Sequence, residues 1–133
     1  MLRKILITDP ISEKALKILK DNNFEIYYEP KITAEKKKEL IKNINGWILR
    51  SGTKIDSSDI LSAKKLQIIG RAGVGVDNID IEQATLNGVV VINVPDGNTV
   101  SAAEHTVAML LSLSRNIEKG HSSLSAGNWD RNK

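Results

Sequence analysis

QIIGRAGVGVDNIDIEQATLNGVVVI, residues 67–92, contains the clearest structural signals of this chain. It opens with a short apolar run at 67–70 and closes with another at 89–92, and isoleucine and valine, which favour strands, dominate both runs. Between the runs, Asp80 stands three residues before Gln83, which is capping-box spacing, and Asn87-Gly88 is a helix stop signal. The segment therefore predicts a strand, a loop, a helix and a second strand.

The same alternation extends back to the amino terminus. Apolar runs at 5–7, 24–28 and 47–49 predict three more strands, separated by segments of helical period. One helix is expected to begin after Thr33 and to end at Gly46, and another is expected over 57–66. Several strands are continuously apolar, which is typical of parallel strands covered on both faces. Residues 1–98 are therefore predicted to form an α/β domain with a flavodoxin-like, doubly wound parallel sheet of five strands.

The composition changes after residues 95–98, PDGN. Ser101 and Glu104 have capping-box spacing, and nearly every residue from 106 to 113 is apolar or small. A helix that is apolar around most of its circumference must be buried on more than one side. We therefore expect this helix to belong to a second domain or to a partner subunit. The alternative is an edge helix on one small domain.

The composition indicates a globular protein and excludes several classes. With 41 % hydrophobic and 26 % charged residues the chain is ordinary for a globular domain, and zero cysteines exclude disulfides, thiol catalysis and cysteine-ligated zinc. A net charge of +3 and 4 % aromatic residues argue against nucleic-acid binding. No apolar run approaches the roughly 20 residues that span a bilayer, and the amino terminus has no signal-peptide pattern. We therefore expect a cytoplasmic protein that binds neither nucleic acid nor membrane.

Two arginines follow neighbouring predicted strands. Arg50 comes directly after the third strand and Arg71 directly after the fourth, in a chain whose 19 basic residues are mostly lysine. Ligands of parallel α/β sheets bind at the carboxyl ends of the strands, and a guanidinium group matches carboxylate or phosphate. With the hydroxyl groups of Ser51 and Thr53, the two arginines indicate an anion site. A salt bridge at the sheet rim for each arginine is the alternative.

The glycine-rich segment 70–78, GRAGVGVDN, follows the fourth predicted strand. Its glycines, including Gly73 and Gly75, allow close backbone approach and can present successive N–H groups to an anion. The segment begins like the G-x-G-x-x-G motif, but Asn78 stands at the sixth position and no suitably spaced ribose-binding acid follows. We therefore predict an anion-binding loop, with a tight turn as the alternative, and not a dinucleotide motif.

The remaining polar residues predict no catalytic or metal site. His105 and His121 are the only histidines, and without cysteine they form no metal-ligand pattern. Asp9, Asp77 and Glu104 are isolated carboxylates, for which a helix cap or a loop brace is the expected role. We therefore expect neither a catalytic residue nor a metal ligand in this chain.

Four stretches resemble the D-isomer-specific 2-hydroxyacid dehydrogenase family, in its order and at its spacing. They are LRSGTK at 49–54, GRAGVGVDNID at 70–80, NVPDGNTVSAAE at 93–104 and GNWDR at 127–131. The likeness covers the whole chain. Within the family, Arg50-Ser51 and the segment 70–73 resemble the branch that oxidises 3-phosphoglycerate to 3-phosphohydroxypyruvate with NAD, which begins serine biosynthesis.

The resemblance implies how a phosphorylated substrate would be held. Arg50 and Arg71 would hold the phosphate, helped by Ser51. Arg131 and Lys133 resemble a basic arm that reaches toward a substrate site, in the same subunit or in a neighbouring one.

The resemblance also implies roles for the glycine-rich loop and for the segment after it. The N–H groups of Val74 and Gly75, next to Gly73, would hold the substrate carboxylate. Val74 would also lie near the cofactor, and Val100 would pack beside the nicotinamide of NAD.

The family resemblance implies a domain organisation as well. Residues 1–98 would be the substrate-binding domain, and residues 99–133 would be the linker helix and the start of an NAD-binding domain, ending before its G-x-G-x-x-G motif. The family's catalytic Arg, Glu and His match no position here, so the chain alone should be inactive. The helix at 99–119 would form a homo-oligomer, a dimer. The alternatives are another family member, such as a glyoxylate or hydroxypyruvate reductase, and a stand-alone anion-binding or interaction module.

Overall fold

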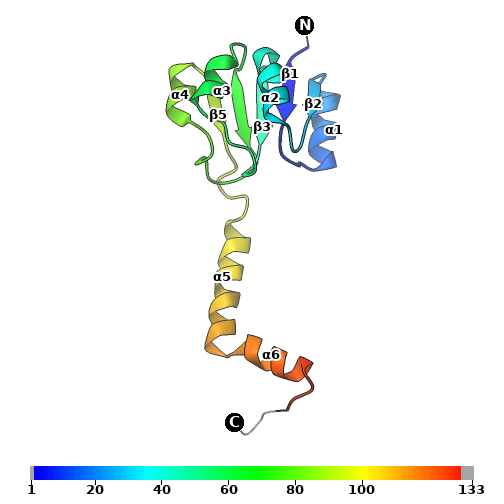
Figure 1. Cartoon of the computed structure of the whole chain (residues 1–133), viewed down its shortest axis with the longest axis vertical. Helices are drawn as coiled ribbons and strands as arrows, with labels where there is room; N and C mark the ends of the chain where they lie inside the picture. Colours follow the sequence, from blue (N-terminus) through cyan, green and yellow to red (C-terminus); the bar gives the residue numbers. More distant parts are fainter. Residues whose placement is uncertain (1, 130–133) are drawn as a thin grey trace. The chain divides into compact units, whose positions relative to one another are not determined.

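The computed structural model describes residues 2–129, in two units with a boundary between Gly97 and Asn98 (Figure 1). The strands of the first unit are β1 Lys4–Ile7, β2 Glu25–Tyr28, β3 Gly46–Leu49, β4 Ile68–Arg71 and β5 Val90–Ile92. Its helices are α1 Glu13–Asp21, α2 Ala34–Leu40, the 3-10 turn η1 Ile41–Asn43, α3 Ser57–Ser62 and α4 Ile81–Leu86. The second unit contains α5 Thr99–Ser114 and α6 Ile117–Ser125.

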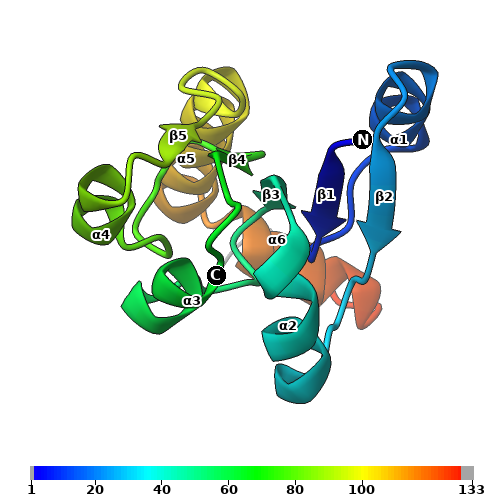
Figure 2. The same cartoon turned by 90° about the horizontal axis from the view of Figure 1, so that it is seen from above.

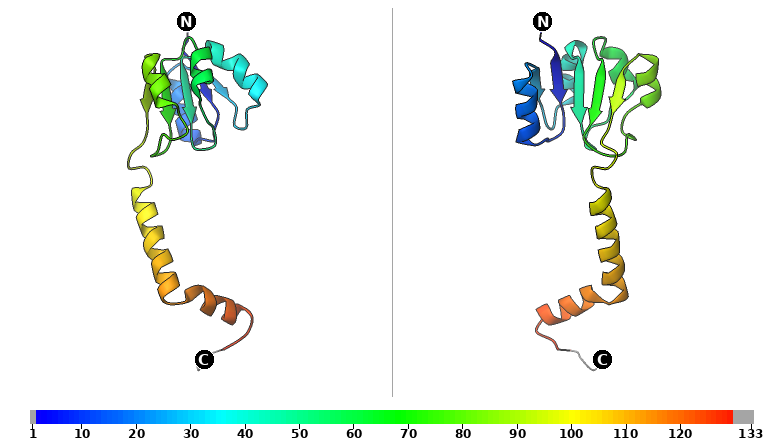
Figure 3. Two further views of the ribbon diagram at one scale, coloured as in Figure 1. Left: turned by 60° about the vertical axis from the view of Figure 1, so that its left-hand side comes forward. Right: turned by 180° about the vertical axis from the view of Figure 1, so that it is seen from behind.

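The five strands form one parallel sheet in the order β2-β1-β3-β4-β5 (Figure 3). Helices cover both faces of this sheet: α1 lies on one face, and α2 and α3 lie on the other (Figure 2). The predicted doubly wound α/β fold is therefore confirmed. Since all strands point the same way, the loops that follow β1, β3, β4 and β5 leave the sheet at one rim.

The main core lies between the sheet and helices α2, α3 and α4. Alternate side chains of the inner strands enter it, among them the fully buried Leu6, Trp47 and Ile69. The Trp47 indole N–H donates to the Thr8 hydroxyl at 3.0 Å, so this large core side chain keeps its one donor paired. On the opposite face, Ile48 lines a pocket with residues of α1, and Ile92, which shares another pocket with Ile48, is exposed.

Side chains cap the amino ends of the four described α-helices of the first unit. Ser12, Thr33, Asp56 and Asp80 each accept a hydrogen bond from the N–H of the third residue that follows. The contact predicted for Asp80 is present, with the Gln83 N–H donating to its carboxylate at 2.9 Å. Such caps satisfy donors that the first helical turn otherwise leaves unpaired.

Two helix ends differ from the sequence predictions. Gly46 does not stop a helix but begins β3, where a Cβ would lie 3.4 Å from the Ile68 side chain on the neighbouring strand. The third helix ends at Ser62 rather than at 66, because the Ala63 N–H closes its last turn and the chain then places Leu66 in the core. Both differences arise from contacts between distant segments, which the local sequence pattern does not indicate.

The second unit differs from the predictions in two further ways. The helix at 99–119 is not continuous, because Asn116 has a left-handed backbone (φ 51°), which asparagine tolerates, and separates α5 from α6. Ser101 does not cap α5, which begins earlier and whose N-cap residue, Asn98, makes no side-chain cap hydrogen bond. The apolar side chains of α5 are exposed, for example Leu110 at 65 %. Among the described residues, none of the helices combines the length and the hydrophobicity of a membrane span.

Candidate functional site

The carboxyl ends of β3 and β4 lie side by side at the rim of the sheet. Leu49 pairs with Arg71 in the strand register, and the Ala72 N–H donates to the Leu49 carbonyl at 2.8 Å. Arg50, which follows Leu49, is therefore close to the beginning of the glycine-rich loop. This end of an open parallel sheet is where ligands bind in α/β proteins.

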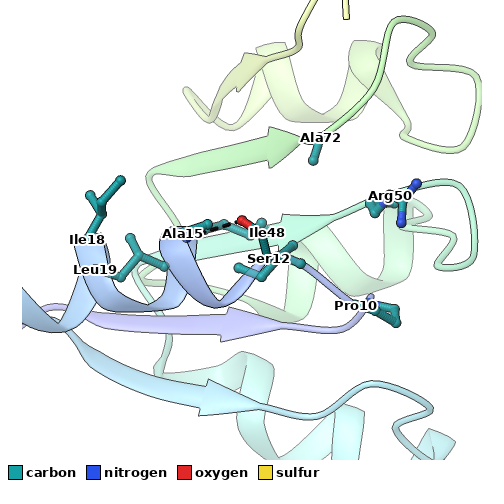
Figure 4. A pocket seen from close by; sticks show the side chains of 9 residues that line it. Pro10, Ser12, Ala15, Ile18, Leu19, Ile48, Arg50 and Ala72 are labelled. Atoms are coloured by element: carbon teal, nitrogen blue, oxygen red, sulfur yellow. Dashed lines mark hydrogen bonds between the residues drawn. The ribbon is translucent and has the colours of Figure 1, made fainter. Parts of the chain in front are cut away.

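Arg50 and Ser51 present free polar groups at this rim. Arg50 is exposed, and no described residue forms a hydrogen bond or an ion pair with its guanidinium group. It lines a largely apolar cavity of about 420 Å³ beside α1, with Ala72 on another wall (Figure 4). The Ser51 hydroxyl also has no hydrogen-bond partner among the described residues. The Thr53 hydroxyl is different, because it donates to the Thr8 carbonyl at 3.4 Å.

Asp9 braces the loop that carries Arg50. One oxygen of its buried carboxylate accepts the Arg50 N–H at 2.7 Å and the Thr53 N–H at 3.1 Å. The loop-brace role predicted for Asp9 is therefore confirmed. Because two backbone donors already hold this carboxylate oxygen, the main chain of the loop is fixed while the Arg50 side chain remains free.

Arg71 lies at the same rim, but its guanidinium group is folded into its own loop. It donates to the Gly75 carbonyl and lies 4.0 Å from the Asp77 carboxylate, and the side chain is only 10 % exposed. Cβ atoms on Gly73 and Gly75 would lie 3.0 Å from Arg71 Nη1 and 2.7 Å from Asp77 Oδ1, so the two glycines make room for this arrangement. The two arginines are therefore neighbours, but they do not form a pair of free guanidinium groups.

The glycine-rich loop presents backbone donors. The N–H groups of Val74 and Gly75 donate to no acceptor within the described residues, and both residues are exposed. Two contacts from the segment after β5 support this loop. The Asn93 amide donates to the Val74 carbonyl at 2.6 Å, and the Val94 N–H donates to the Gly73 carbonyl at 2.9 Å. The loop thus combines fixed carbonyl groups with free N–H groups.

The other candidate residues lie elsewhere. Val100 is in the first turn of α5 and is 69 % exposed. His105 lies on α5 and His121 on α6, and no group of three possible metal ligands occurs in the part of the chain that the structure describes. Arg131 and Lys133 lie outside the described residues.

The rim gathers several hydrogen-bond donors that have no partner among the described residues. Arg50 offers a planar charged donor pair, Ser51 a hydroxyl, and the loop at 74–75 two backbone N–H groups. Sequence reasoning missed two amides, those of Asn93 and Asn78, which hold main-chain carbonyls of the site loops. Nothing in the sequence pattern distinguished these asparagines from ordinary turn residues.

The fold and the rim together define an α/β domain with unpaired hydrogen-bond donors at the carboxyl end of its parallel strands. Residues 5–127 match the family model described as D-isomer specific 2-hydroxyacid dehydrogenase, catalytic domain. The chain belongs to the D-isomer specific 2-hydroxyacid dehydrogenase family.

Individual relatives support this assignment. The D-3-phosphoglycerate dehydrogenase of Methanocaldococcus jannaschii is 46 % identical over 130 residues, which are 98 % of this chain and 25 % of that protein. Among solved structures, an NAD⁺-bound 3-phosphoglycerate dehydrogenase of Entamoeba histolytica has a TM-score of 0.72 and 36 % identity, covering 84 % of this chain and 39 % of its own. An NADPH-dependent glyoxylate/hydroxypyruvate reductase of Sinorhizobium meliloti, in complex with NADP and malonate, has a TM-score of 0.76 and 26 % identity. The match covers 99 % of this chain and 40 % of the reductase chain. The chain spans about a quarter of the length of the curated relatives that it matches first.

Proposed function

We propose that the protein of which this chain forms part is an NAD-dependent oxidoreductase. It converts 3-phospho-D-glycerate to 3-phosphohydroxypyruvate, a reaction of serine biosynthesis, in the cytoplasm. Residues 1–98 are its substrate-binding domain, and residues 99–133 are the linker helix and the start of its NAD-binding domain. The observation that supports this best is the free Arg50 guanidinium at the rim, in a chain 46 % identical to a D-3-phosphoglycerate dehydrogenase.

The rim binds the two ends of the substrate through different donors. Arg50, with the Ser51 hydroxyl, binds the phosphate, and the N–H groups of Val74 and Gly75 bind the carboxylate. Arg71 turns from its acceptors in the loop toward the phosphate when substrate binds. Holding both anionic ends fixes the carbon that carries the hydroxyl group, so the contribution of this domain to catalysis is positioning and charge complementarity.

Two apolar side chains of this chain suit a nicotinamide ring. Val74 is exposed at the rim, and Val100 is exposed in the first turn of α5, so both offer a face on which such a ring packs. NAD, when bound, accepts a hydride from the substrate. The family's catalytic Arg, Glu and His and its G-x-G-x-x-G motif have no counterpart in this sequence, so this chain alone is inactive.

The second unit provides the contact between subunits. The apolar side chains of α5, among them Val107, Leu110 and Leu111, are exposed within the described residues. An exposed apolar surface of this kind is typical of an interface. We propose that it packs against the NAD-binding domain and against a second copy in a homodimer.

The test is an assay of the full-length protein with NAD and two substrates, 3-phosphoglycerate and D-glycerate. Arg50→Ala should weaken binding of the phosphorylated substrate by about 1.5–3 kcal/mol, because a charge-assisted contact is lost. Arg3→Ala is the matched control, since Arg3 is an exposed arginine that precedes β1, at the other end of the strands. An unchanged KM for 3-phosphoglycerate in Arg50→Ala would remove Arg50 from the site.

A second candidate is a reductase for glyoxylate or hydroxypyruvate. The folded Arg71 supports it, because only one free guanidinium group then remains at the described rim, which suits a substrate with one anionic end. The same assay separates the two, since such a reductase prefers the unphosphorylated substrate. A stand-alone anion-binding module would instead bind the phosphorylated acid tightly as the isolated chain, and the full-length protein would show no turnover.

A further inference from the structure

Asp9 holds the loop from Arg50 to Thr53 through the backbone N–H groups of the loop. The same carboxylate oxygen accepts the N–H groups of both Arg50 and Thr53. The other oxygen, Oδ1, lies where a side chain on Gly52 would have to go, because a Cβ there would be only 2.3 Å away. A single carboxylate therefore fixes both ends of the loop and requires glycine between them.

The same loop is held on the carbonyl side by Asn78. Its amide nitrogen donates to the Arg50 carbonyl at 2.7 Å and also to the Thr53 carbonyl. Within the Asn78 amide only the nitrogen can donate, and its two N–H bonds suit two carbonyl acceptors, so the orientation of this amide is determined by its partners. Asp9 and Asn78 thus hold the same two residues, Asp9 through their N–H groups and Asn78 through their carbonyl groups.

The backbone around Asn78 is itself fixed. The Ile55 N–H donates to the Asn78 carbonyl at 2.9 Å, and the Asp80 N–H donates to the Ile55 carbonyl at 3.0 Å, which forms a short bridge between Ile55 and Ile79. Asn78 follows the glycine-rich loop, so this bridge ties the loop after β3 to the loop after β4. The Asn78 side chain therefore extends from a main chain that backbone hydrogen bonds hold in place.

The amide oxygen of Asn78 is left without a partner. Asn78 Oδ1 is buried and accepts no hydrogen bond within the described residues. An unpaired buried acceptor is unfavourable, so stability alone does not account for an asparagine here. The two donor contacts to the Arg50 loop are what the residue gains in return.

We infer that Asn78 is a positioning residue for the phosphate-binding Arg50, acting together with Asp9; this inference rests on the proposed function. The Arg50 guanidinium has no protein partner among the described residues, so its direction depends on the main chain that carries it. Fixing that main chain from both sides sets the point from which the free guanidinium reaches the phosphate. A loop that is already ordered binds more tightly, because less order must be created when the substrate arrives.

The test uses the full-length enzyme and measures KM and kcat for 3-phosphoglycerate and for D-glycerate. Asn78→Ala should raise KM for 3-phosphoglycerate about tenfold, because a small displacement of a binding group has effects of at least this size. The values for D-glycerate, which lacks the phosphate, should change less than twofold. The double variant Arg50→Ala, Asn78→Ala should be no worse than Arg50→Ala alone, because the amide acts only through the arginine.

Two further variants separate positioning from stability. Asn45→Ala is the matched control, because Asn45 also joins two backbone segments, accepting the Lys4 N–H at 3.0 Å and donating to the Lys65 carbonyl at 3.3 Å, but at the amino end of β3. It should lower the melting temperature without changing the preference for the phosphorylated substrate. Asp9→Asn should retain that preference, since an amide oxygen still accepts both N–H groups, whereas Asp9→Ala should lose it.

The outcomes distinguish this inference from the function on which it rests. If Asn78→Ala affects both substrates equally, or if its effect adds in full to that of Arg50→Ala, the positioning role is wrong while Arg50 remains the phosphate ligand. If Arg50→Ala itself leaves KM for 3-phosphoglycerate unchanged, the proposed phosphate site is wrong, and the positioning role is overturned with it.

Discussion

The two units of this chain contain similar fractions of apolar sequence but use it differently. In the first unit, Leu6, Trp47 and Ile69 are fully buried between the sheet and its helices, and each described α-helix has a side-chain cap. In the second unit, no described side chain of α5 is buried, and neither α5 nor α6 has a side-chain cap. The first unit therefore contains its own stabilising interactions, whereas α5 has the composition of a buried helix and lacks a covering surface within the described residues.

The largest effect on the free energy of unfolding should come from replacing a leucine by alanine in the first unit, compared with the same replacement in the second unit. Leu6→Ala should lower the free energy of unfolding by about 2–5 kcal/mol, because the removed side chain leaves a cavity in a closely packed core. Leu110→Ala should change it by less than about 0.5 kcal/mol, because this leucine is 65 % exposed. Urea denaturation of the isolated chain measures both values, followed by tryptophan fluorescence, whose change on unfolding reports the exposure of the buried Trp47. Equal losses would show that Leu110 is buried in the isolated chain as deeply as Leu6.

The helix caps provide a second, smaller contrast. Asp56 accepts the Asp59 N–H at 3.0 Å, and the Asp59 side chain accepts the Asp56 N–H in return. Asp56→Ala should therefore cost about 1 kcal/mol of unfolding free energy. Asn98→Ala should cost much less, because the Asn98 side chain makes no cap hydrogen bond. The same denaturation experiment tests this prediction. If Asn98→Ala lowers the unfolding free energy as much as Asp56→Ala does, the Asn98 side chain caps α5 in solution.

The sequence predicted the elements whose signals are local. The apolar runs around Ile69 and Val91 indicated strands, and the Asp80–Gln83 spacing indicated a helix start, because strand burial and helix capping depend on neighbours in the sequence. The position of Arg50 at the rim followed from the same reasoning, since the residue after a parallel strand must leave the sheet there.

The features that could not be predicted depend on contacts between segments. For Arg71 the alternative of a salt bridge at the rim is the one that the structure shows, but its partners, the Gly75 carbonyl and the Asp77 carboxylate, come within reach only once the loop has formed. Asn78 holds the Arg50 loop across 28 positions of sequence, so its role is visible only in three dimensions. The backbone of a site was thus more predictable than the directions of its side chains.

The smallest effect concerns the pH dependence of the first unit. Hydrogen bonds from the Ser58 hydroxyl and from the Asp59 N–H lower the pKa of Asp56 in the folded chain. The stability that this carboxylate contributes is therefore present above its unfolded pKa of about 3.9 and is lost as the pH falls through the lower, folded value. Because the group is largely solvated, the contribution should be only about 0.5 kcal/mol.

Asp56→Asn isolates this contribution, because asparagine keeps the capping oxygen and removes the titration. The unfolding free energy of the variant should fall less steeply than that of the original chain between about pH 5 and about pH 2. Glu25 and Glu35, whose pKa values are also lowered, by hydrogen bonds from Tyr27 and from the backbone N–H of Glu35 respectively, are present in both proteins and cancel in the comparison. Identical acid slopes would mean that the Asp56 carboxylate is as well solvated in the folded chain as in the unfolded one. Its cap would then stabilise α3 through the geometry of the oxygen alone.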